Sequence, residues 1–146
     1  KAVIEIGTGR GYLSLFLSMW AMLNDAEVLT IDITAERKEP KVEDALELLG
    51  TIQEVGDCFD PAFTAKIGNF MSSSKAVLYA DGGNKTAEIR HFVNLLKPGD
   101  AIACHDWTVE VQPQDFPEEW EKNNGLTPIF NYHQRRGTRI MAWKRA

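Results

Sequence analysis

The sequence predicts an α/β fold with a doubly wound, mostly parallel seven-stranded sheet and an antiparallel last strand. Short apolar runs alternate with stretches of helical periodicity, an order typical of parallel sheets with helices on both faces. Near the end of the chain, two apolar runs flank a polar turn, which indicates a closing hairpin. We therefore expect a single domain over residues 1–146.

The chain opens on an apolar strand, Val3–Ile6, that leads into a turn with alternating glycines, Gly7–Gly11. Glycine adopts positive φ at little cost and lets a ligand come close to the backbone. The helix expected over 11–23 is apolar nearly all round, which suits a helix packed on a sheet. Its N-terminus offers unpaired N–H groups to a polar or anionic ligand, so this segment predicts a nucleotide-like cofactor.

Four further strands follow, and helices are expected between them. Pro40 interrupts a short helical turn before the second helix, and Asp60 followed by Pro61 is a typical helix start. The expected strands cover 27–32, 51–55, 76–81 and 101–104. The expected helices cover 41–49 and 60–71, and a further helix is expected to follow the turn Gly82–Asn84 and to end after Leu96.

The end of the chain is expected to hold a short helix and then a hairpin. Asp115 and Glu118 have the spacing of a capping box, which predicts the start of the helix. Leu126–Tyr132 and Thr138–Trp143 predict two strands, joined by the turn Gln134–Gly137.

Composition restricts the partners and the compartment. The net charge of −5 gives no general attraction to nucleic acid or anionic lipid, and the longest apolar run, Tyr12–Leu23, is too short to span a bilayer. Cys58 and Cys104 lack metal-binding spacing, so we expect free thiols in a reducing, cytoplasmic compartment. The chain begins on a strand without Met, which leaves a preceding segment open as an expectation.

Acids follow several strands where doubly wound sheets bind ligands. Right-handed crossovers place the carboxyl ends of parallel strands at one edge, where Asp32, Asp81 and Asp106 are expected. A carboxylate at Asp32 can accept hydrogen bonds from both hydroxyls of a ribose. The glycine spacing G-x-G-x-G differs from the G-x-G-x-x-G of dinucleotide sites, and an ordinary turn at Gly7 and Gly9 is the alternative.

The segment Glu5–Gly11, together with the acid at Asp32 and the closing hairpin, resembles the class I S-adenosylmethionine-dependent methyltransferases. The resemblance covers nearly the whole chain and implies a Rossmann-like methyltransferase fold with S-adenosylmethionine as cofactor. The residues that it implies for cofactor binding are Glu5, Gly7, Thr8, Gly9, Asp32, Ile33, Asp57, Cys58 and Asp81. For Asp57, an ordinary turn residue is the alternative, because Gly-Asp is common turn chemistry.

A narrower resemblance rests on Tyr79–Asn84, Leu96–Asp100 and Cys104–Asp106. These segments are similar to the D-G-x-H element, the L-K-P-G-G turn and the terminal His-Asp pair of one methyltransferase branch. That branch includes the macrocin and rhamnosyl O-methyltransferases and the cephalosporin hydroxylase-like proteins. Asn84 stands in place of the histidine, and Asp100 in place of the second glycine.

Several relatives in this branch bind Mg²⁺, which implies a metal site at Asp81 and Asp106, with His105 where relatives often have Glu. An imidazole suits Mg²⁺ less well than a carboxylate, so Mg²⁺ or another divalent cation is one of two expectations. In the other, Asp81 caps a helix or meets the methionine end of the cofactor. His105 or Asp106 is then the catalytic base, and an orienting role for His105 stays open.

The two resemblances therefore imply a methyltransferase that acts on a hydroxyl of a small molecule, such as a sugar or a natural product. The fourth strand does not end in the D/N-P-P-Y/F element of DNA amino-methyltransferases. One alternative is a non-catalytic accessory domain that binds S-adenosylmethionine. Another is an NAD-dependent oxidoreductase, which the glycine spacing and the hairpin disfavour. A homo-oligomer in which a partner supplies a pocket wall also stays open.

Overall fold

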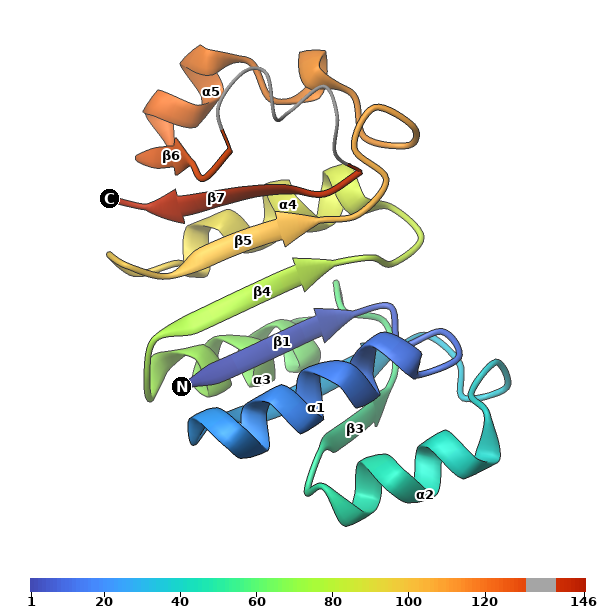
Figure 1. Cartoon of the computed structure of the whole chain (residues 1–146). Coiled ribbons are helices and arrows are strands. Elements are labelled where there is room, and N and C mark those ends of the chain that lie inside the picture. The colour runs from blue at the N-terminus through green and yellow to red at the C-terminus, as the bar shows by residue number, and fades with distance from the viewer. Residues whose placement is uncertain (131–138) are drawn as a thin grey trace. The chain divides into compact units, whose positions relative to one another are not determined.

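The computed structural model describes residues 1–130 and 139–146 (Figure 1). The chain divides into two compact units, Lys1–Ala76 and Val77–Ala146, and each is described by itself. Within the described residues, no helix combines the length and the apolar character needed to cross a membrane.

The first unit is a parallel three-stranded sheet with helices on its faces. Its strands, in the spatial order β3-β2-β1, are β1 (Ala2–Ile6), β2 (Glu27–Asp32) and β3 (Ile52–Val55). Its helices are α1 (Tyr12–Asn24), α2 (Pro40–Leu48) and α3 (Pro61–Ser72). Figure 1 shows α1 in front of β1 and α3 behind it, the arrangement of a doubly wound sheet.

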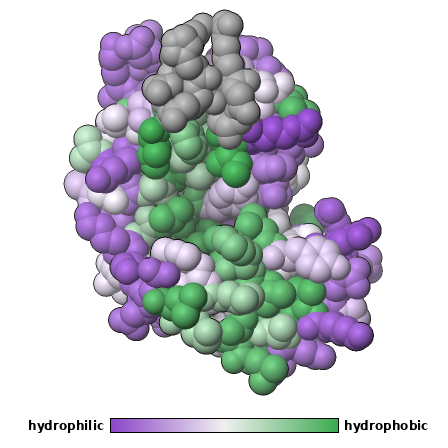
Figure 2. Space-filling model, in the orientation of Figure 1, coloured by the Kyte–Doolittle hydropathy of each residue, from purple (hydrophilic) through white to green (hydrophobic). Residues whose placement is uncertain are grey.

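Small side chains connect α1 to the sheet. Ser14, Ser18 and Ala21 form the buried face of the helix, whereas the large apolar side chains of Phe16 and Leu23 are exposed. Figure 2 accordingly shows hydrophobic surface gathered over this helix. The helix is apolar nearly all round, as expected, but the close approach to the sheet depends on residues that are small and partly polar.

Two helices in the first unit begin with a proline. Asp60 Oδ1 accepts a hydrogen bond from Ala62 N at 2.8 Å, and Pro61 occupies the first helical position, which confirms the predicted start of α3. A short turn precedes Pro40, in which Lys38 N donates a hydrogen bond to Ala35 O. Pro40 is the first residue of α2, where its missing N–H is not needed.

The second unit contains parallel and antiparallel pairs of strands, in the order β4-β5-β7-β6. β4 and β5 are parallel, and β7 runs antiparallel to both β5 and β6. The strands are β4 (Ala76–Ala80), β5 (Ala101–Cys104), β6 (Leu126–Pro128) and β7 (Met141–Arg145). The helices are α4 (Lys85–Phe92), α5 (Glu118–Asn123) and the 3-10 helices η1 (Val93–Leu95) and η2 (Pro113–Asp115).

Aromatic side chains form the core beside β7. Trp143 lies edge-on to Trp107, with 5.8 Å between the ring centroids, and to Phe116 at 5.3 Å. The indole N–H of Trp143 donates a hydrogen bond to Glu121 Oε1 at 2.6 Å, so its polar atom is paired inside the core. Trp107 is therefore a packed core residue.

The capping box and the hairpin differ from the prediction in position. The capping box joins Gln112 and Asp115, because the Asp115 carboxylate accepts a hydrogen bond from Gln112 N and is not free to cap α5. The hairpin strands are shorter, and β7 begins three residues later than expected, at Met141. The predicted turn Gln134–Gly137 lies outside the described residues.

The described residues confirm the predicted fold class. They contain seven strands with helices between them, the first five strands are parallel within each unit, and the last pair is antiparallel. The strands Glu27–Asp32 and Ala101–Cys104 have the predicted bounds.

Candidate active site

The glycine turn after β1 has the backbone geometry that glycine allows. Gly9 and Gly11 have φ of +53° and +85°, values that other residues adopt only with strain. A Cβ on Gly11 would lie 2.8 Å from Val42 Cγ1, so this glycine also permits α2 to pack close to the turn. Gly11 precedes the first residue of α1, which leaves the N–H groups of the first helical turn without partners inside the helix.

Asp32, the last residue of β2, is tied to this turn. Its Oδ2 accepts a hydrogen bond from Gly9 N at 2.7 Å, and its Oδ1 accepts one from Thr34 N at 3.3 Å. The carboxylate is half-buried and linked to the loops on both sides. Asp32 is thus fixed in orientation at the end of its strand, where the sequence predicted it.

Two other predicted cofactor residues, Glu5 in β1 and Thr8 in the turn, have side chains that face inward. Glu5 is only 1% exposed, and its carboxylate accepts hydrogen bonds from the hydroxyls of Ser14 and, at 2.6 Å, Thr30. The hydroxyl of Thr8 is also buried and lies 2.6 Å from Thr30 Oγ1. This network connects β1, α1 and β2 beneath the turn.

The remaining predicted cofactor residues of the first unit differ in exposure. Ile33 follows Asp32 and is 72% exposed. Asp57 is exposed, and its Oδ1 accepts a hydrogen bond from Phe59 N at 2.9 Å, which is the turn geometry expected of aspartate. Cys58 is buried beside it.

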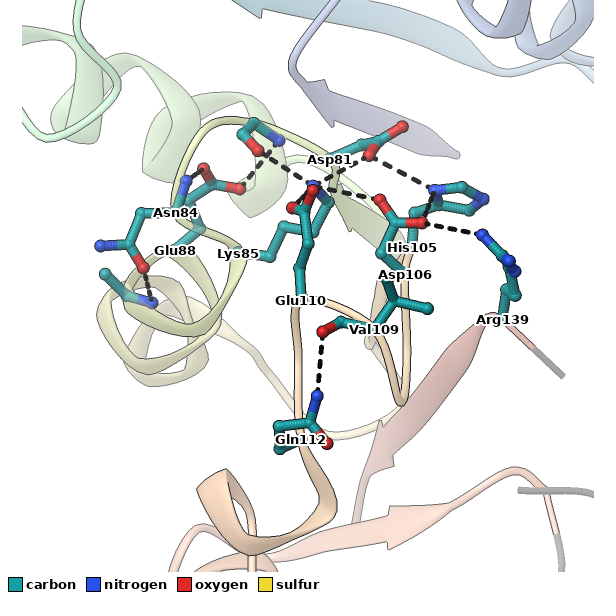
Figure 3. A network of polar contacts seen from close by, with 12 residues as sticks. Asp81, Asn84, Lys85, Glu88, His105, Asp106, Val109, Glu110, Gln112 and Arg139 are labelled. Atoms are coloured by element: carbon teal, nitrogen blue, oxygen red, sulfur yellow. Dashed lines mark hydrogen bonds and ion pairs between the residues drawn. The ribbon is translucent and has the colours of Figure 1, made fainter. Parts of the chain in front are cut away.

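Asp81, His105 and Asp106 come together in the second unit (Figure 3). The parallel register pairs Ala80 with Cys104, so the residues that follow β4 and β5 are neighbours. His105 Nδ1 lies 3.1 Å from Asp106 Oδ1 and 3.7 Å from Asp81 Oδ1. One potential ligand atom from each of the three lies within 4.8 Å of the others.

The backbone at Asp106 has an unusual conformation that fixes the loop after β5. Its φ is +55°, a region that aspartate enters more readily than most residues. Its carbonyl oxygen accepts hydrogen bonds from the N–H groups of Val109, Glu110 and Val111. The loop therefore folds back on the backbone of Asp106, and the carboxylate of Asp106 faces His105 through Oδ1 and Lys85 through Oδ2.

Lys85, which the sequence analysis did not select, lies among these acids. Its side chain is 6% exposed, and its Nζ is 2.6 Å from Glu110 Oε2 and 3.5 Å from an oxygen of both Asp81 and Asp106. The same Nζ donates to Gly82 O at 3.2 Å. The spacing of Asp81 and Lys85, four residues apart, is the only sequence signal for this contact, and it is common on protein surfaces.

Nearby charges and burial shift the pKa values of Asp81 and Lys85 in opposite directions. Burial raises the pKa of Asp81, and the nearby charges of Lys85 and His105 only partly offset it. Burial by itself lowers the pKa of Lys85, but the hydrogen bond to Glu110 and the acid charges outweigh it and raise the pKa above the ordinary value. Lys85 is therefore a permanent cation at neutral pH.

Glu88 holds the turn between β4 and α4. It is 2% exposed, and its two carboxylate oxygens accept hydrogen bonds from Gly82 N at 3.2 Å and Asn84 N at 3.1 Å. A Cβ on Gly82 would collide with this carboxylate. Asn84, which replaces the histidine of the D-G-x-H element, caps α4 by accepting a hydrogen bond from Ala87 N.

Solved structures place this fold in a known class, that of the Rossmann-like methyltransferases. A Klebsiella pneumoniae protein described as a candidate O-methyltransferase matches 100% of this chain and 74% of its own, with 20% identity and a TM-score of 0.59. The O-methyltransferase TomG of Streptomyces achromogenes, solved with SAM, matches 99% and 73%, with 17% identity and a TM-score of 0.59.

A 30S ribosomal A1408 methyltransferase from an uncultured bacterium is similar to the same degree. It matches 100% of this chain and 88% of its own, with 10% identity and a TM-score of 0.59. At these identities the likeness shows the fold. A search of curated proteins finds no match.

A family model assigns the chain within this class. The model for Rhamnosyl O-methyltransferase/CmcI matches residues 1–141, nearly the whole chain. The chain belongs to this family and is an enzyme of the methyltransferase type, which confirms the resemblance drawn from the sequence.

Proposed function

We propose that the protein transfers the methyl group of S-adenosylmethionine to a hydroxyl of a small molecule, such as a sugar or a natural product. The family match over residues 1–141 is the observation that carries this proposal. The solved structure of TomG with SAM supports the choice of cofactor. A small molecule is favoured over nucleic acid as the acceptor because the net charge is −5.

The first unit is proposed to bind the nucleoside part of the cofactor. Asp32 would accept hydrogen bonds from the ribose hydroxyls, since its orientation is fixed at the end of β2. The exposed side chain of Ile33 and the segment Asp57–Cys58 would contact the adenine. Gly7 and Gly9 would let the cofactor approach the backbone.

For Glu5 and Thr8, the buried network supports a positioning role. Both side chains bond inside the unit, so they would act on the cofactor through the shape of the glycine turn. Their backbone atoms remain part of the proposed binding segment. This refines the sequence prediction, which placed both residues at the cofactor.

The second unit is proposed to supply the catalytic base. Methyl transfer forms a bond between the acceptor oxygen and the methyl carbon as the carbon–sulfur bond breaks, and S-adenosylhomocysteine leaves. The methyl donor is already activated, so the protein must align the acceptor and take its proton. His105 Nδ1 lies against Asp106, which would hold the ring so that Nε2 accepts this proton.

A divalent cation at this cluster was the other expectation. Asp81, His105 and Asp106 would hold it, and it would lower the pKa of the acceptor hydroxyl. The two carboxylates suit a hard cation, but the Lys85 ammonium already lies 3.5 Å from an oxygen of each. This donor set therefore fits a dication poorly, and the mechanism proposed here uses the protein's own groups.

Two measurements test the proposed function. Calorimetry should show binding of S-adenosylmethionine and S-adenosylhomocysteine and none of NAD. Transfer of a labelled methyl group should then be found with a hydroxyl acceptor from a panel of sugars and natural products. Absence of binding by both sulfur compounds would overturn the proposal.

A variant identifies the base. His105→Gln should bind the cofactor as tightly as wild type and lose methyl transfer, by roughly 10²-fold or more if His105 is the base. His91→Gln is the matched control, because His91 is an exposed residue of α4. Equal activity of His105→Gln and wild type would remove His105 from the mechanism.

A homo-oligomer stays a prediction, which light scattering would test.

A further inference from the structure

The surroundings of Lys85 in Figure 3 are those of a cation held by several acceptors. Its ammonium faces the carboxylates of Asp81, Asp106 and Glu110 and the carbonyl oxygen of Gly82. The three acids belong to two different segments, the one after β4 and the one after β5. One lysine thus bridges the two strand ends that make the proposed catalytic cluster.

The position of Lys85 would be unfavourable for a positive charge if the acids were not beside it. Lys85 is the first residue of α4, where the helix dipole disfavours a positive charge. Its side chain is almost fully buried, and burial of a charge is costly unless the charge is paired and hydrogen-bonded. The surrounding carboxylates pair with the charge of Lys85 and accept its hydrogen bonds. The acid cluster, and not the helix, therefore explains why a lysine is stable at this position.

The same contacts separate this cluster from a ready metal site. A dication bound to Asp81 and Asp106 would share their carboxylates with an ammonium already beside both. Two cations on the same pair of carboxylates repel each other, and the repulsion is stronger at this half-buried cluster than it would be in bulk water. His105, the third ligand candidate, is a softer ligand than a carboxylate and adds no negative charge.

We infer that the Lys85 ammonium is the resident cation of the Asp81–His105–Asp106 cluster, so that the cluster holds no divalent cation and works without one. The single charge of the lysine offsets part of the negative charge of these acids, and its ammonium lies 3.5 Å from an oxygen of both Asp81 and Asp106. Its relevance to methyl transfer rests on the proposed function. The electrostatic part, that the lysine excludes a dication, can be tested without any turnover.

Binding of Mn²⁺, followed by the loss of the free-ion electron paramagnetic resonance signal, provides the test. Wild type should bind Mn²⁺ no more tightly than the Asp81→Asn variant. Lys85→Met keeps much of the apolar stem but removes the charge, and it should bind Mn²⁺ at least about tenfold more tightly than wild type. Adding Asp106→Asn to Lys85→Met should abolish this gain, because the acid would be a ligand.

Two variants serve as controls for charge and folding. Lys122→Met makes the same charge change at an exposed lysine paired with Glu118, so its Mn²⁺ affinity should equal that of wild type. Lys85→Arg keeps a cation and should bind Mn²⁺ no more tightly than wild type. If Lys85→Met fails to fold by circular dichroism, the comparison of wild type with Asp81→Asn still decides the question.

The outcomes distinguish this inference from the proposed function. Tighter Mn²⁺ binding by wild type than by Asp81→Asn would overturn the inference, as would an unchanged affinity in folded Lys85→Met. Methyl transfer by wild type should be unaffected by a chelator, and its loss would overturn the inference while leaving the function intact. Failure to bind S-adenosylmethionine would overturn the function, whereas the Mn²⁺ comparison would stand.

Discussion

The backbone N–H of Gly9 donates a hydrogen bond to Asp32 Oδ2 at 2.7 Å, so the glycine turn and the end of β2 hold each other in place. One carboxylate oxygen of Asp32, the residue proposed to bind the ribose, thus already accepts a hydrogen bond from the turn. The second oxygen accepts only a longer bond, from Thr34 N at 3.3 Å. We expect cofactor binding to depend on the turn and the acid together.

Replacement of Asp32 by alanine should therefore weaken S-adenosylmethionine binding in two ways. It removes the proposed ribose contact, and it removes the hydrogen bond that holds the glycine turn in place. Loss of a charge-assisted hydrogen bond costs about 1.5–3 kcal/mol, or roughly 10- to 100-fold in affinity. Calorimetry measures this, with Asp44→Ala as a control at an exposed acid of α2. Wild-type affinity in Asp32→Ala would contradict the ribose assignment.

The buried carboxylate of Glu88 should make stability depend on pH. Burial raises its pKa above the ordinary 4.5, so the folded state binds a proton more tightly than the unfolded state. Its contribution to the free energy of unfolding is then fully present below about pH 4.5 and is lost as pH rises through the folded pKa. The loss is about 1.4 kcal/mol for each unit of the shift.

Urea unfolding of wild type and Glu88→Gln between pH 4 and pH 7 measures this contribution. The difference in unfolding free energy should change in favour of Glu88→Gln as pH rises, while other titrating groups cancel. Glu119→Gln, at an exposed position of α5, should show no such trend. A difference that is constant over this range would contradict the raised pKa.

The hydrogen bond between Trp143 and Glu121 should contribute to the stability of the second unit. Glu121→Ala leaves the indole N–H of a fully buried tryptophan without its acceptor, at a cost of about 1–3 kcal/mol. Chemical denaturation should show the loss, and Glu119→Ala on the exposed side of the same helix should be within about 0.5 kcal/mol of wild type. Equal stability of the two variants would exclude this role.

Cys104 should be unreactive in the folded protein. Burial raises the pKa of its thiol to about 12, so roughly one thiol in ten thousand is ionised at pH 8. In a Cys58→Ser variant Cys104 is the sole cysteine of the chain. Mass spectrometry should find it alkylated by iodoacetamide only after unfolding in urea, and equally fast labelling in buffer would disprove the prediction.

Much of the fold was predictable because its signals are local. Apolar runs, glycines and the Asp60–Pro61 pair depend on neighbours in sequence, and the strand Glu27–Asp32 has its predicted bounds. The capping box was misplaced because the carboxylate of Asp115 bonds to Gln112, an alternative that spacing does not decide. The start of β7 was missed by three residues, because its pairing with β5 and not its own pattern sets where it begins.

The candidate site was predictable in part for the same reason. Asp81, His105 and Asp106 follow adjacent parallel strands, so topology alone brings them together. Lys85 was missed because its significance depends on contacts with acids from two loops, and one of them, Glu110, is 25 residues away in sequence. The inward orientation of Glu5 was also hidden, since its partners Ser14 and Thr30 lie on other elements.

The positive φ of Asp106 restricts how this site can change. A left-handed backbone costs most residues roughly 1–2 kcal/mol, and only glycine, asparagine and aspartate adopt it readily. Of these three, aspartate alone carries a charge. Few residues can therefore replace Asp106 without deforming the loop. Glutamate, which elsewhere is the conservative replacement for aspartate, is one of the disfavoured residues. Asparagine and glycine would keep the backbone conformation and remove the charge, so no substitution keeps the charge at position 106 without straining the loop.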